Sequence, residues 1–195
     1  MITADIFKRI LKGRVVIIGI GNVLRGDDGL GPELVQRLSY KVEACCINAG
    51  NALENHLGPI GRYNPDTVLL VDAMHLGLRP GDVRIVDPSR IEHAGLSTHD
   101  VSPCLFLDFL VEASNCNVFL LGVQPEGIEI GSGMSTAVQN TLDSLERELL
   151  EALGGVARQS LPEAARPRAA GDFEETITIK EENGSWKQHG TFSPL

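Results

Sequence analysis

Two carboxylate positions and one imidazole fall where structured segments of this sequence are expected to end. Asp27 and Asp28 lie in a glycine-rich turn that follows an apolar run. Asp72 ends a second apolar run, and His99 comes just before a predicted helix. In a parallel α/β sheet, the carboxyl ends of the strands meet at one crevice. Two carboxylates and an imidazole in one crevice predict a metal site.

Strands and helices are expected to alternate along the chain, and this order is typical of an α/β fold with a mostly parallel sheet. The apolar run from Val15 to Ile20 is the kind of strand that is buried on both faces. The strand at 83–87 is expected at an antiparallel edge. The pattern predicts strands over 14–20, 42–48, 67–72, 83–87 and 118–123, and helices before Gly13 and over 32–38, 51–60, 102–113 and 135–153.

Length and charge indicate one domain with a tail and exclude a nucleic-acid-binding protein. A chain of 195 residues is too short for two ordinary domains, so we expect a domain over 1–154 and a linker with a C-terminal tail over 155–195. The tail carries an alternating run at 176–180 and an Asn183-Gly184 turn signal, which predict either a small hairpin or disorder. The net charge is −9, whereas a nucleic-acid-binding protein would show a basic face.

The sequence carries no sign of secretion or of membrane insertion. Charged residues interrupt the N-terminal segment, which therefore does not resemble a signal peptide. No apolar run approaches the roughly 18 residues of a membrane span. None of the four cysteines forms a C-x-x-C pair, and reduced cysteines fit an intracellular protein. We expect a cytoplasmic protein that acts as a monomer.

Other chemistry is less well supported. A dinucleotide-binding turn would need glycine at position 24, where the chain has Leu24. There is no G-x-S-x-G nucleophile turn, and Cys104, although near His99, is expected to pack in a helix. Structural roles stay open for the acidic residues. Asp27 is a candidate cap of the helix after it, and Asp72 is a candidate acceptor of backbone N–H groups.

Five short motifs, in order and at plausible spacing, resemble those of the hydrogenase maturation proteases, which trim the large subunit of nickel–iron hydrogenases. The resemblance covers about residues 14 to 150, and it is closest to the formate-hydrogenlyase type. The matching segments are Gly19-Ile20-Gly21-Asn22 with Arg25 to Pro32, Asn48-Ala49-Gly50 with Glu54-Asn55, Leu69 to Ala73, Ser97-Thr98-His99, and Leu121 to Pro125.

The resemblance implies a three-layer fold: a twisted, mostly parallel five-stranded sheet with helices on both faces. It implies an endopeptidase that removes a C-terminal extension from the nickel-loaded precursor of a hydrogenase large subunit. The metal ligands would be Asp28, Asp72 and His99, the nickel would be supplied by the substrate, and zinc or another divalent ion could occupy the same site. Candidates for supporting the ligands or contacting the substrate are Asp27, Asn22, Gly50, His75 and Asp100.

Two alternatives and one departure from the family pattern accompany this hypothesis. A nickel-sensing assembly factor could have the same site without hydrolysis. The germination-protease-like relatives of this fold share acidic residues but act on other proteins. Many family members have Asp-Gly-Gly where this chain has Asn48-Ala49-Gly50, so a carboxylate role is not expected at position 48.

Overall fold

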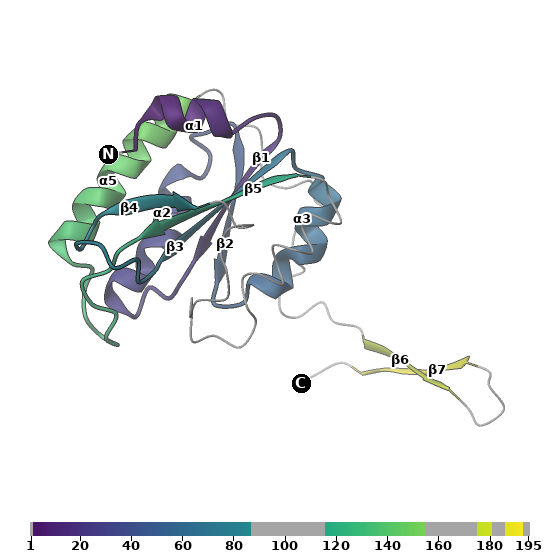
Figure 1. Cartoon of the computed structure of the whole chain (residues 1–195). Helices are drawn as coiled ribbons and strands as arrows, with labels where there is room; N and C mark the ends of the chain where they lie inside the picture. The colour runs from purple at the N-terminus through teal and green to yellow at the C-terminus, as the bar shows by residue number, and fades with distance from the viewer. Residues whose placement is uncertain (1, 87–115, 155–174, 181–185, 193–195) are drawn as a thin grey trace. The chain divides into compact units, whose positions relative to one another are not determined.

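A computed structural model describes residues 2–86, 116–154, 175–180 and 186–192 (Figure 1). The chain divides into two compact units, Met1–Ala165 and Arg166–Leu195. The first unit contains α1 (Ala4–Ile10), β1 (Val15–Ile20), the 3-10 turn η1 (Gly26–Gly29), α2 (Leu30–Leu38), β2 (Ala44–Gly50), the 3-10 turn η2 (Leu53–His56), α3 (Leu57–Tyr63), β3 (Thr67–Ala73), β4 (Val83–Val86), β5 (Asn117–Val123) and α5 (Thr136–Leu153).

The five strands of this unit form one sheet in the order β2-β1-β3-β5-β4. β1 pairs in parallel with β2 and with β3, and β3 pairs in parallel with β5. β4 pairs with β5 in the antiparallel sense and lies at the edge. The predicted α/β fold with a mostly parallel sheet is therefore confirmed, and so is the antiparallel edge strand.

Helices cover both faces of the sheet and make three layers (Figure 1). Alternate residues of β1 show how one strand serves both faces. Ile17 packs with side chains of α1, α2 and α5, whereas Ile18 belongs to the cluster that contains Leu53 of η2 and Ile60 of α3. Because both faces are covered, the central strands read as continuous apolar runs.

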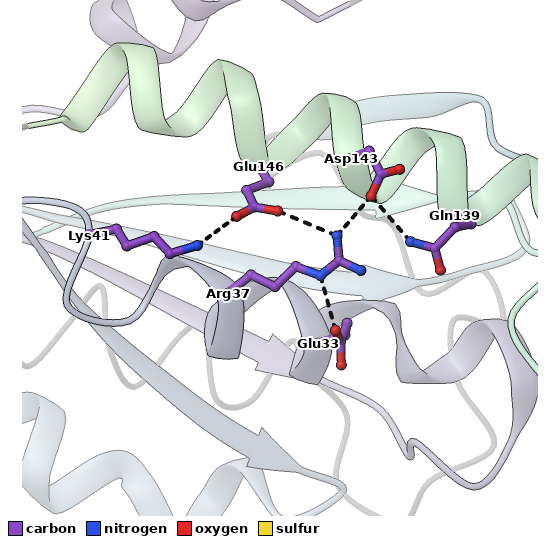
Figure 2. Close-up of polar contacts among 6 residues, drawn as sticks. All are labelled: Glu33, Arg37, Lys41, Gln139, Asp143 and Glu146. Carbon is purple, nitrogen blue, oxygen red and sulfur yellow. Dashed lines mark hydrogen bonds and ion pairs between the residues drawn. The ribbon is translucent and has the colours of Figure 1, made fainter.

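A network of ion pairs joins α2 to α5 at the surface (Figure 2). Arg37 lies 3.0 Å from Glu33 on its own helix, 2.7 Å from Asp143 and 3.4 Å from Glu146. Lys41 also reaches Glu146, at 3.0 Å. Lys41, and secondly Arg37, hold the pKa of Glu146 below its ordinary value, and Arg37 does the same for Asp143. The network holds α5 against the helix that follows η1.

Two elements differ from the prediction. β2 begins at Ala44 and continues to Gly50, because Val42 instead forms an isolated bridge with Gly154. The helix expected over 51–60 is split, and α3 begins at Leu57. Pro59 has no N–H and fits only the first turn of a helix, which favours a start near Leu57. The helix expected over 102–113 lies outside the described residues.

In the second unit, β6 (Glu175–Lys180) pairs antiparallel with β7 (Trp186–Phe192).

None of the helices in the described part of the chain is long and apolar enough to cross a membrane.

Candidate active site

Asp72 lies at the carboxyl end of the central strand β3, in register with Gly122 of β5. The parallel strand β1 ends on the other side of β3, where Gly19 pairs with Val71. The turn that follows β1 carries Asp28 and leads into α2. The crevice predicted at the carboxyl ends of the strands therefore has two candidate ligands. Asp28 lies in the turn after β1, and Asp72 lies at the end of β3.

Two glycines let the turn and the start of α2 approach the sheet closely. A Cβ atom on Gly31 would overlap the carbonyl oxygens of Ile20 and Val71. Gly21 has φ +125°, a conformation that other residues rarely adopt, and a Cβ there would overlap the carbonyl oxygen of Asp28. These close approaches set Asp28 near the end of β3.

Asp28 and Asp72 interact electrostatically. Burial, and secondly the negative charge of Asp28, raise the pKa of Asp72 to about 7, while the backbone N–H of Ala73 partly offsets this. The carboxylate of Asp28 accepts a hydrogen bond from the backbone N–H of Asn22 at 2.9 Å, which orients it. A carboxyl group whose ionisation is opposed by burial and by a nearby carboxylate forms a site that a cation would stabilise.

Asp27 has a different role from its neighbour Asp28. It is fully buried, and its carboxylate accepts hydrogen bonds from the backbone N–H groups of Glu126 (2.7 Å), Gly127 (3.2 Å) and Ser135 (2.6 Å). The hydroxyl of Ser135 donates a fourth, at 3.0 Å. The interpretation of Asp27 as a cap of the following helix is wrong, because α2 has Gly29 at its N-cap and no side-chain cap bond. Asp27 instead ties η1 to the loop before α5.

Asn22 and Gly50 shape the backbone beside Asp28. The side-chain oxygen of Asn22 accepts the N–H of Leu24 at 2.9 Å, which closes a tight turn. The carbonyl of Gly50, at the end of β2, accepts the N–H of Gly21 at 3.0 Å. The side-chain oxygen of Asn48 accepts the N–H of Gly50 at 3.0 Å, so this side chain has a backbone partner.

His75 is exposed, three residues beyond Asp72, and Gln124 lies next to it. The amide nitrogen of Gln124 is 3.4 Å from Nδ1 of His75. Its amide oxygen accepts the N–H groups of Leu76 at 2.7 Å and Leu78 at 3.3 Å, so this buried side chain shapes the loop after β3. Sequence reasoning missed Gln124 as a site residue, although it follows β5 as Asp72 ends β3.

His99 and Asp100 lie outside the described residues. Within the described residues, no three His, Cys, Asp or Glu side chains are grouped so as to hold a metal ion. The described portion of the site is therefore a pair of carboxylates, and the three-ligand arrangement with His99 stays a prediction.

Comparison with known proteins points to one protein family. A family model described as hydrogenase maturation protease matches residues 30–152. The chain is 32% identical over 153 residues to the hydrogenase 3 maturation protease of Escherichia coli K12, and the match covers 76% of this chain and 97% of that one.

Solved structures with the same fold lead to the same family. The crystal structure of the nickel–iron hydrogenase maturation protease HycI from Thermococcus kodakarensis matches with a TM-score of 0.71 and 29% identity, over 76% of this chain and 98% of that one. The solution structure of the endopeptidase HycI from Escherichia coli matches with a TM-score of 0.63 and 30% identity, over 77% and 99%.

Proposed function

This chain belongs to the hydrogenase maturation protease family, and from that membership we propose that it removes a C-terminal extension from the nickel-loaded precursor of a nickel–iron hydrogenase large subunit. The reaction adds water across one peptide bond and releases the extension. The nickel is part of the substrate and reaches the site with it.

The proposal is supported most directly by the paired carboxylates of Asp28 and Asp72. The burial of Asp72, and secondly the negative charge of Asp28, disfavour the ionisation of Asp72 when no cation is present. A divalent ion bound by both carboxylates would displace the proton of Asp72. Its two positive charges would balance the negative charges of Asp28 and Asp72. Oxygen ligands of this kind, joined by an imidazole, suit divalent transition metals.

In the proposed complex, Asp28, Asp72 and His99 bind the nickel of the precursor. Three protein ligands leave coordination positions open for substrate atoms or for a water molecule. An ion held in this way can polarise the scissile carbonyl or lower the pKa of a bound water. It can also serve only to mark a precursor that is ready for cleavage, and then the chain recognises nickel without using it in catalysis.

Zinc and other divalent ions would compete for the same three ligands. Affinities for such sites generally rise from manganese through nickel to copper, with zinc close behind. Because the nickel arrives with the substrate, the isolated chain should purify with little tightly bound metal. Treatment with a chelator, followed by its removal, should leave the activity intact.

The test is to incubate the full chain with nickel-loaded and with nickel-free precursor and to measure the masses of the products by mass spectrometry. We expect release of the extension from the nickel-loaded form only. An Asp28→Asn variant, which has nearly the same size but no charge, should release nothing. Efficient cleavage of the nickel-free form, or of unrelated peptides, would contradict the proposal. Binding without cleavage would favour the nickel-sensing assembly factor.

A further inference from the structure

Three of the four exposed large apolar side chains of the described residues gather on two loops beside Asp28. Val23 is 61% exposed, Leu24 is 67% exposed and Ile130 is 81% exposed. The fourth, Tyr40, is 79% exposed and lies in the turn between α2 and β2. Isolated exposed apolar residues are ordinary on protein surfaces, but a group of them beside a functional site indicates an interaction surface.

The two loops are joined by hydrogen bonds into one surface. The carbonyl of Leu24 accepts the N–H of Gly131 at 2.8 Å, directly after Ile130. The guanidinium of Arg25 donates to the carbonyl of Ile128 at 3.3 Å. We call Val23, Leu24 and Ile130 the two-loop surface.

The backbone of the two-loop surface is held in place before any partner arrives. Leu24 uses both of its backbone groups, since its N–H donates to Asn22 and its carbonyl accepts from Gly131. Asp27 adds the four bonds that fasten η1 to the second loop. An apolar surface that is already ordered loses little further conformational entropy when it binds.

This surface is continuous with the proposed cleavage site. The backbone N–H of Asn22 lies 2.9 Å from the carboxylate of Asp28, and Val23 is the next residue. Consecutive Cα atoms are about 3.8 Å apart, so a substrate strand of two or three residues spans about 7–10 Å. Such a strand would reach from Asp28 to Val23. A polypeptide placed at Asp28 and Asp72 would therefore have Val23 and Leu24 within reach.

We propose that the two-loop surface is a docking site for an apolar segment of the hydrogenase large-subunit precursor, next to the bond that is cleaved. This inference rests on the proposed function and adds to it a determinant of substrate binding. Large apolar side chains that become buried in an interface contribute to its affinity, by about 1.5–3 kcal/mol for each fully buried side chain. The two-loop surface would therefore act on the affinity for the precursor, and the carboxylates on the chemical step.

The experiment compares a Leu24→Ser/Ile130→Ser double variant of the full chain with Tyr40→Ser. The control removes an apolar side chain of similar exposure just before the start of β2. This place is at the amino ends of the parallel strands, whereas Asp28 and Asp72 lie at their carboxyl ends. Binding of nickel-loaded precursor is measured by biolayer interferometry, and cleavage by mass spectrometry. We expect the double variant to bind at least about tenfold more weakly, with KM raised and kcat little changed. Tyr40→Ser should bind as the wild type does.

Further variants and outcomes separate the explanations. Leu24→Met/Ile130→Val should keep tight binding, and Leu24→Gln and Ile130→Gln are measured singly in case the double variant does not fold. Wild-type affinity in the serine or glutamine variants, or an equal loss in Tyr40→Ser, would overturn the inference. So would a wild-type dimer, detected by sedimentation, that the serine variants dissociate without a change in precursor binding.

Failure of the proposed function gives a different result. A wild-type chain that binds the precursor but releases no fragment contradicts the proposed hydrolysis, and the docking surface is still judged by the binding of the variants. A wild-type chain that binds no precursor overturns the docking inference itself.

Discussion

Replacing Asp72 with asparagine should stabilise the fold and abolish precursor processing. Asparagine keeps the size of the side chain but cannot ionise, so it removes the cost of a buried charge beside Asp28. Burial and Asp28 raise the pKa of Asp72 from 3.8 to about 7. One pKa unit corresponds to about 1.4 kcal/mol, so ionised Asp72 lowers the free energy of unfolding by about 4 kcal/mol.

The pH dependence of this cost has a definite sign. Below pH 3.8 the carboxyl is protonated in both the folded and the unfolded chain, and the cost is absent. Above about pH 7 it is ionised in both, and the full cost is present. Wild-type stability should therefore fall across this range relative to Asp72→Asn, and the difference between them should grow by about 2–3 kcal/mol from pH 5 to pH 8.

Urea unfolding of both proteins at pH 5 and pH 8 measures this difference directly. Asp28→Asn is the matched control, because it removes the smaller of the two causes and leaves the desolvation of Asp72 in place. It should give a smaller gain and retain most of the pH dependence. Asp72→Asn that is no more stable than the wild type at pH 8, or a gain that is the same at both pH values, would refute the reasoning.

Three other changes test separate parts of the structure. His99→Ala should abolish release of the extension while the circular dichroism spectrum keeps its native form, and full activity would contradict its assignment as a ligand. Asp27→Ala should lower the free energy of unfolding by about 3 kcal/mol, measured in urea, because several buried donors lose their acceptor. Arg37→Ala should cost about 1 kcal/mol at pH 7 and low salt. Asp143 has a lowered pKa, so its contribution is present above pH 3.8 and is lost as the pH falls through its folded-state value; a cost of Arg37→Ala that does not fall as the pH is lowered below 3.8 would contradict this.

The sheet could be predicted because its strands and helices carry their patterns locally. The run from Val15 to Ile20 is buried nearly throughout, and α5 buries a regular stripe that includes Val138 and Leu142. The meeting of Asp28 with the end of β3 followed from one general property of parallel sheets, that their carboxyl ends lie at the same edge.

The parts that could not be predicted depend on partners far away in the chain. Asp27 and Asp28 have the same side chain and nearly the same local sequence, yet one is fully buried and the other is not. What separates them is the loop around Glu126 and Ser135, about a hundred positions later, which supplies donors to Asp27. Gln124 was missed for the same reason, since its role depends on backbone N–H groups of the loop after β3.

The long separation between Asp27 and its partners also sets the order in which the site can form. The hydrogen bonds of its carboxylate close segments of 99 to 108 residues, and long closures of this kind form late in folding. A nascent chain that has not yet reached Ser135 can pair β1 with β3, but it cannot yet form the full set of bonds that ties η1 to the loop before α5. A chain that ends before Ser135 therefore lacks two of the four hydrogen bonds to the Asp27 carboxylate.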